Sequence, residues 1–209
     1  MRTQPSLTTR VLHLGISISI TLQLLVSTFM DKPKPGPAMP LWASLGFDVH
    51  EVVGILSLPV LLLWFIWLFV RKGEAEFKEL FPWFRRSTVT AWYGSLSHAL
   101  SAWRSRIMPY SADNERVAHS VHGLGALCAL GMALSGFVVW LGLNPQGNLT
   151  EWAQLSLSIH RLLANLMWVY WVGHSAMAVW HQSKGESILQ QMFSLLPYMN
   201  SHAGTRFKN

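Results

Sequence analysis

Long apolar runs alternate with more polar segments along this chain. The apolar runs cover residues 11–30, 49–70, 117–143 and 155–180. A helix rises about 1.5 Å per residue, so a run of about 20 residues is long enough to cross about 30 Å of hydrocarbon. Because backbone amides find no water partners inside a bilayer, we expect each run to be helical. The pattern predicts an all-α protein built as a four-transmembrane-helix bundle.

The segments between the runs differ in kind. Residues 31–40 contain four prolines, which is typical of an extended connection. We expect one transmembrane domain over residues 1–195, with a long connection at about residues 71–116, followed by a tail at residues 196–209. Inside the long connection, apolar residues recur at helical spacing over residues 88–106. This spacing predicts an amphipathic helix at the membrane surface, with a segment that docks a partner protein as the alternative.

Composition supports a membrane location. Hydrophobic residues make up 51% of the chain and charged residues only 12%, about half the charged share of a typical soluble domain. The chain also contains 11 Trp, a side chain that favours the membrane interface. The formal charge of +6 does not indicate nucleic-acid binding, because Lys and Arg lie between the apolar runs rather than along one polar face.

The basic residues also predict the orientation. Lys and Arg are concentrated before the first run, in the second connection and in the tail. The first connection contains only Lys32 and Lys34, and the third contains neither residue type. The positive-inside rule then places both termini in the cytoplasm of a bacterial-type inner membrane. The first run has the basic start of a signal peptide, but no small-residue cleavage site occurs near Met30, so we expect it to remain as a helix.

Six of the nine histidines lie in or at the ends of the apolar runs. Ionisable groups are costly inside a bilayer and usually functional, although a single histidine can also serve as a hydrogen bond between helices. His160 and His174 are fourteen residues apart, which places them about 40° apart around one helix and about 21 Å apart along it. Both therefore lie on one helix face, one near each side of the membrane.

Two other histidines lie at matching depths. His13 lies near the cytoplasmic start of the first run, and His50 lies near the outer start of the second. We predict that His13 pairs with His174 and His50 with His160, and that each pair holds the iron of one haem b. Two imidazoles saturate the iron, which favours electron transfer over gas binding. His181, seven residues after His174, is the alternative partner of His13.

Several neighbours of these histidines are candidate site residues. Gly54 lies one turn after His50, where it either leaves room for a flat macrocycle or packs two helices together. Arg161 either pairs with a haem propionate or attracts an anionic reactant such as superoxide. His122, which shares a helix face with His119, either lines a quinone pocket and carries its protons or has a packing or propionate role.

The chain resembles the prokaryotic cytochrome b561 family, which includes the cytochrome b subunits of nickel hydrogenases and formate dehydrogenases. The likeness rests on the run His160-Arg-Leu-Leu-Ala-Asn-Leu with His174 fourteen residues on, on His50-x-x-x-Gly54, and on His13. It covers about residues 7 to 195. The resemblance implies two haems b held by these four histidines, and quinone or quinol chemistry at one membrane face.

The chain departs from this family in two places. The second connection is longer than in the short members, and Arg161 stands where some members have an acidic residue. Both departures concern the reaction partner, so two electron-transfer functions stay open. The chain is either a self-contained oxidoreductase between quinone and a small outer reactant, or the membrane anchor of a dehydrogenase or hydrogenase with a partner subunit.

A membrane bundle without redox function is the alternative of another class. Histidines could serve a transporter of divalent metal ions, but such sites usually add carboxylates to imidazoles. Asp48 and Glu51 lie only at the outer edge of the second run, and no Asp or Glu lies deeper in the runs. A purely structural bundle leaves the four histidine positions unexplained. Covalent c-type haem is excluded because the chain has one cysteine, Cys128.

Overall fold

In the computed structural model the chain forms a bundle of helices. The structure describes residues 5–31, 40–84, 86–104, 112–144 and 146–194. Among these residues, four helices are long and apolar enough to cross a membrane, which confirms the predicted four-helix transmembrane bundle. They are α1 (Leu7–Val26), α2 (Leu41–Val70), α5 (Ala112–Leu141) and α6 (Glu151–Ser183).

The helix ends differ from the ends of the apolar runs. α1 begins at residue 7 rather than 11, because the Ser6 hydroxyl caps it by accepting a hydrogen bond from the backbone N–H of Thr9 at 3.2 Å. α2 begins directly after Pro40, well before the apolar run at residue 49. Hydropathy marks the part of a helix that lies in hydrocarbon, whereas the helix itself continues into the interface.

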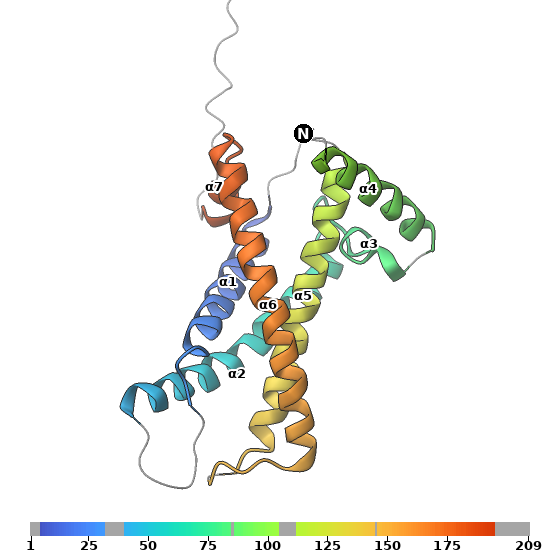
Figure 1. Cartoon of the computed structure of the whole chain (residues 1–209). Coiled ribbons are helices and arrows are strands. Elements are labelled where there is room, and N and C mark those ends of the chain that lie inside the picture. Colours follow the sequence, from blue (N-terminus) through green and yellow to red (C-terminus); the bar gives the residue numbers. More distant parts are fainter. Residues whose placement is uncertain (1–4, 32–39, 85, 105–111, 145, 195–209) are drawn as a thin grey trace, which may run out of the picture.

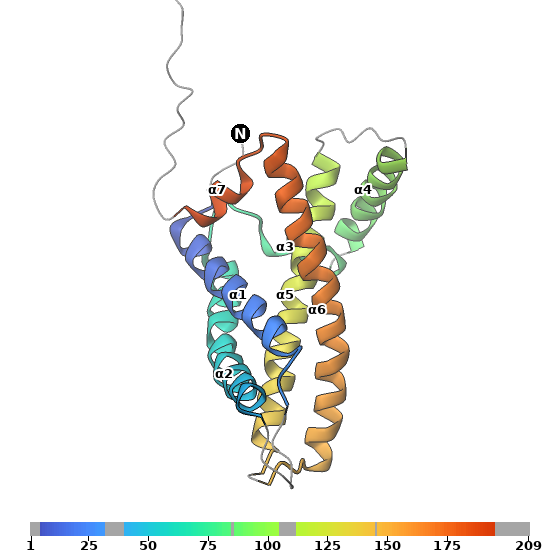
Figure 2. The ribbon, with the colours of Figure 1, turned by 60° about the vertical axis from the view of Figure 1, so that its left-hand side comes forward.

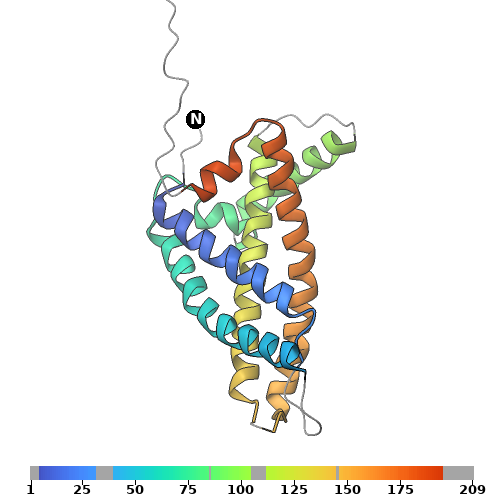
Figure 3. The same ribbon diagram turned by 90° about the vertical axis from the view of Figure 1, so that its left-hand side faces the viewer.

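The four long helices form two antiparallel pairs. α5 packs along α6, and α1 and α2 form a second pair that is inclined against the first (Figure 1, Figure 3). α3 (Phe77–Leu80), the 3-10 helix η1 (Pro82–Phe84), α4 (Arg86–Arg104) and α7 (Ile188–Phe193) lie at the end where α1 begins. We name this the inner end, and Figure 2 shows α7 crossing there from α6 to α1. That the inner end faces the cytoplasm stays a prediction.

Apolar side chains cover the outside of the bundle. Val169 is 74% exposed and Phe69 is 70% exposed, as expected for side chains that contact lipid. The buried core is correspondingly small, with Leu24, Leu61, Ala129 and Met167 meeting where the four long helices approach one another. The stability of the bundle therefore depends on close helix contacts more than on a large core.

The connection between α2 and α5 packs closely against α5. A Cβ atom at Gly123 would lie 2.0 Å from the carbonyl oxygen of Leu80, so only glycine allows α3 to approach this closely. Phe81 is 2% exposed and its ring stacks on Phe65 of α2. The helix predicted over residues 88–106 is present as α4 over residues 86–104, and residues 105 and 106 lie outside the described residues. Its place at the membrane surface stays a prediction. Trp92 Nε1 of α4 donates a hydrogen bond to Ser120 Oγ of α5 at 2.8 Å.

Candidate functional site

Four histidines from three helices meet as two pairs inside the bundle. The ring centroids of His13 on α1 and His174 on α6 are 6.3 Å apart, and the two ring planes are inclined by 54°. The ring centroids of His50 on α2 and His160 on α6 are 6.1 Å apart, with the planes at 88°. These are the couples that helix depth predicts, one toward each end of α6. That they ligate a metal stays a prediction.

The spacing within each pair fits a shared metal atom. An imidazole nitrogen binds a metal ion at about 2 Å, and the ring centroid lies about 1 Å behind that nitrogen, so two imidazoles on opposite sides of one metal have centroids about 6 Å apart. Both observed separations, 6.3 Å and 6.1 Å, agree with this value. In the separation of their rings, both pairs therefore suit a shared haem iron.

The ring of His160 is oriented by α5. Its Nδ1 lies 3.0 Å from the carbonyl oxygen of Met132 and 3.1 Å from the hydroxyl of Ser135. Because a carbonyl oxygen can only accept, Nδ1 carries the proton and Nε2 is left free to bind a metal. Gly136 gives the ring its space, since a Cβ atom there would lie 3.1 Å from His160 Cε1. Sequence analysis missed all three α5 residues, because no local pattern marks the partner of a residue on another helix.

A cavity adjoins His50 and His160. It contains about 1100 Å³ of space between atoms, part of it open to the surroundings, and all four long helices line it with mostly apolar side chains. A pocket of this kind suits a large apolar ligand with a few polar anchors. The cavity therefore places an apolar lining beside the two imidazoles, as the site of a macrocycle requires.

Polar atoms beside His50 support a binding role for this cavity. Gln23 Nε2 donates to the backbone carbonyl of His50 at 2.8 Å, and Gly54 leaves room for this amide because a Cβ atom would lie 2.9 Å from Nε2. Gln23 Oε1 and His50 Nδ1 are buried without a hydrogen-bond partner among the described residues. Such atoms are rare and are typical of redox, catalytic or ion-binding sites.

The inner pair has aromatic and histidine neighbours. Tyr170 stacks on His174 with ring centroids 5.3 Å apart and planes inclined by 11°. Gly125 makes this possible, since a Cβ atom there would lie 2.2 Å from Tyr170 Cζ. His122 lies edge-on to His174 at 4.9 Å. Phe193 of α7 covers His13 from the inner end, with ring centroids 5.7 Å apart.

The other candidate residues lie apart from the two pairs. His181 Nδ1 is 3.1 Å from Glu186 Oε2, so the structure places His174 rather than His181 against His13. The Arg161 side chain is exposed, and Glu51 Oε1 accepts a hydrogen bond from Trp140 Nε1 at 3.2 Å. Within the described ranges, no group of three or more His, Cys, Asp or Glu side chains could hold a metal ion.

Comparison with known proteins identifies the family of the chain. A family model described as prokaryotic cytochrome b561 matches residues 5–195, which include the four long helices and all four paired histidines. No curated protein and no solved structure matches the chain. The match covers nearly the whole chain and therefore shows the family to which it belongs. The chain belongs to the prokaryotic cytochrome b561 family, and it is a membrane protein that binds haem b and transfers electrons.

Proposed function

We propose that the chain binds two haems b and carries electrons across the bacterial inner membrane, with quinone or quinol as the reactant at the inner end. The observation that carries this proposal is the pair of imidazole couples, at 6.3 Å and 6.1 Å, fourteen residues apart on α6. In this proposal His13 and His174 hold the inner haem, and His50 and His160 hold the outer haem. When bound, each haem supplies one-electron oxidation and reduction at its iron.

The surrounding residues orient these histidines and exclude water from them. The bond from His160 Nδ1 to the Met132 carbonyl aims Nε2 at the metal and raises the basicity of the ring. His13 Nδ1 lies 3.3 Å from the Ser17 hydroxyl, which itself donates to the His13 carbonyl at 2.7 Å. The hydroxyl thus acts as acceptor for His13 Nδ1–H, and Nε2 is again the free nitrogen. A mostly apolar lining limits water, which is one of the terms that set a haem potential.

An optical spectrum of the purified chain tests this proposal. Protein made in haem-replete cells should contain two haems per chain and show sharp reduced bands of the bis-histidine b type. The haem content by pyridine haemochrome assay, divided by the protein concentration, gives the stoichiometry. A folded but colourless protein would exclude the proposal, and a single haem would limit it to one histidine pair.

His122 is the proposed proton carrier for quinone at the inner end. Its Nδ1 donates to the Ala118 carbonyl at 2.6 Å, which leaves Nε2 as a free acceptor near His174. Quinone reduction consumes protons, and imidazole exchanges protons near neutral pH. His122 and the stacked Tyr170 thus bring polar groups to an otherwise apolar region beside the inner pair. A packing role for His122 is the competing interpretation.

Replacing His122 by alanine should slow quinol-dependent haem reduction about 100-fold, the smaller end of the range for general acid–base catalysis, while both haems remain bound. Stopped-flow reduction by a short-chain quinol measures the rate, and reduction by dithionite confirms the haem content. His119→Ala is the matched control, because the His119 ring lies 3.9 Å from Glu79. Unchanged quinol kinetics in His122→Ala would assign this residue to packing.

A second candidate function is the membrane anchor of a dehydrogenase or hydrogenase. α4 supports it, because this helix projects from the bundle in Figure 1, and its residue Tyr93 is 61% exposed while Ser95 is buried. The exposed face is available to a partner subunit. An anchor should copurify with a subunit that carries metal clusters, whereas a self-contained oxidoreductase should turn over quinone when purified alone. Arg161 stays the proposed partner of an outer haem propionate or of an anionic reactant.

A further inference from the structure

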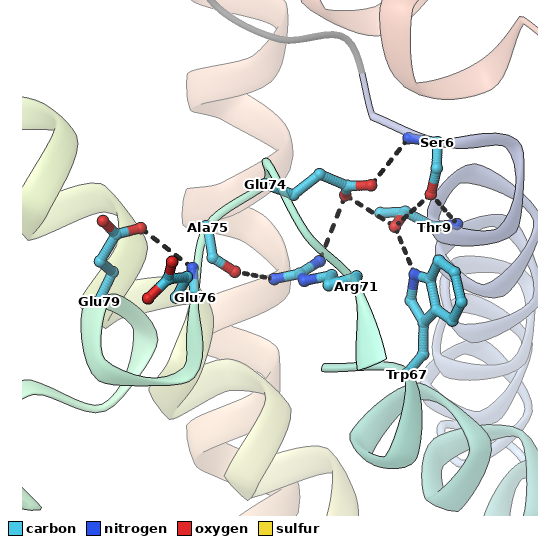
Figure 4. Close-up of polar contacts among 8 residues, drawn as sticks. All are labelled: Ser6, Thr9, Trp67, Arg71, Glu74, Ala75, Glu76 and Glu79. Atoms are coloured by element: carbon cyan, nitrogen blue, oxygen red, sulfur yellow. Dashed lines mark hydrogen bonds and ion pairs between the residues drawn. The ribbon is translucent and has the colours of Figure 1, made fainter. Parts of the chain in front are cut away.

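Outside the histidine site, the carboxylate of Glu74 contacts the first turn of α1. α2 ends at Val70, and Gly73 then adopts a φ of +77°, a left-handed conformation that glycine reaches without strain. The chain thereby turns back and presents Glu74 to the start of α1 (Figure 4). The Glu74 side chain is only 11% exposed.

Both carboxylate oxygens of Glu74 bind α1. Oε1 accepts a hydrogen bond from the backbone N–H of Ser6 at 3.0 Å, and Oε2 accepts one from the Thr9 hydroxyl at 2.8 Å. The Thr9 oxygen also accepts from Trp67 Nε1 of α2 at 2.8 Å, so the same group joins three segments. A negative charge at this position is further stabilised by the partial positive charge at the start of a helix.

Arg71 holds the carboxylate from the other side. Its Nη1 lies 3.5 Å from Glu74 Oε2 and its Nη2 donates to the Ala75 carbonyl at 2.5 Å, as Figure 4 shows. The Arg71 side chain is 7% exposed. Burial lowers the pKa of its guanidinium, and the carboxylates of Glu74 and Glu79 act in the opposite direction. Removing either partner of such a buried pair is strongly destabilising, because it leaves an uncompensated buried charge.

The contact lies one helical turn from the inner histidine pair. Thr9 and His13 are four residues apart on α1, which places them about 6 Å apart along the axis and on the same face. α1 packs mainly on α2. The position of α1 on α2 therefore determines where His13 lies relative to His174 on α6. A slip of one residue would move His13 by about 1.5 Å and rotate it by about 100°, which is enough to break a shared metal site.

We propose that Glu74 is a positioning residue for the inner histidine pair. By binding Ser6 and Thr9 while it is held by Arg71, the carboxylate sets the depth and rotation of α1 so that His13 faces His174. The inference rests on the proposed function, because it takes these two histidines as haem ligands. The outer pair lies farther from this contact, because His50 and His160 are on α2 and α6 and α1 reaches them through the hydrogen bond from Gln23 to the His50 carbonyl.

The test uses the full-length protein and the variants Glu74→Gln and Glu74→Ala. Loss of a group that orients metal ligands typically weakens metal binding by about 10-fold or more, and we expect about 10-fold weaker retention of the inner haem in Glu74→Ala. Glu74→Gln keeps one acceptor and should lie between wild type and Glu74→Ala. Redox titration and electron paramagnetic resonance should show a changed inner haem and an unchanged outer haem, with His174→Ala identifying the inner signals. Glu151→Gln, at the opposite end of the bundle, is the matched control.

Two outcomes would overturn this inference. The first is an inner haem with unchanged retention, potential and resonance signal in Glu74→Ala. The second is an equal change of both haems together with a lower melting temperature, which would show a general structural role. If Glu74→Ala does not fold, Thr9→Val tests the same contact by removing only the hydroxyl. A wild-type chain that lacks a haem at His13 and His174 would instead contradict the proposed function.

Discussion

Replacing either histidine of one pair by alanine should remove one haem and leave the other in place. His50→Ala and His160→Ala should both lose the outer haem, and His13→Ala and His174→Ala should both lose the inner haem. The reason is that a bis-histidine iron needs an imidazole on each side, and no other described histidine ring contacts the outer pair. The reduced b-type absorbance should therefore fall by about half in each variant.

Haem content, redox titration and electron paramagnetic resonance together identify which haem is lost. The two variants of a pair should give the same spectrum, and the double variant His50→Ala/His160→Ala should lose no more haem than either single variant, because the two residues act as a unit. His181→Ala is the control and should keep both haems, since its ring contacts Glu186. Loss of the inner haem in His181→Ala would contradict the proposed pairing.

Gly123→Ala should destabilise the protein by forcing α3 away from α5. The added Cβ atom would lie 2.0 Å from the oxygen and 2.8 Å from the carbon of the Leu80 carbonyl. These are backbone atoms, so no side-chain rotation relieves the overlap and the whole segment around Phe81 must move. Overpacking of this kind typically lowers the free energy of unfolding by about 1–3 kcal/mol.

Thermal unfolding in detergent, followed by circular dichroism, measures this effect. Gly94→Ala in α4 is the matched control, because nothing lies within 4 Å of a Cβ atom there. Alanine should raise helix stability at that site by up to about 1 kcal/mol. Equal melting temperatures for Gly123→Ala and wild type would show that α3 does not pack on α5 as closely as the structure places it.

Much of the fold could be predicted because the bilayer restricts which backbone structures can cross it. Inside hydrocarbon only a helix satisfies the backbone, so long apolar runs identify α1, α2, α5 and α6. The ends of these helices were less predictable. α2 begins at Leu41 rather than near residue 49, because residues 41–47 are themselves mostly apolar and only Asp48 separates them from the predicted run.

Part of the candidate site could likewise be predicted from the sequence, and part could not. His160 and His174 lie on one face because helical geometry alone relates residues fourteen apart. The direction in which each helix crosses the membrane then predicts which histidines meet. The contacts around them could not be predicted. Ser135 beside His160 depends on how α5 is rotated against α6, and one helix carries no pattern that reports this rotation.

By itself, the sequence determined the four helices, the histidines that share a depth and the family to which the chain is similar. Only the tertiary structure decided that Gly123 leaves room for α3, that Tyr170 stacks on His174, and that Glu74 accepts a hydrogen bond from Thr9. The physical reason is that periodicity and hydropathy are properties of one helix in its solvent. Rotation and depth of one helix against another arise from packing, which joins residues far apart in the chain.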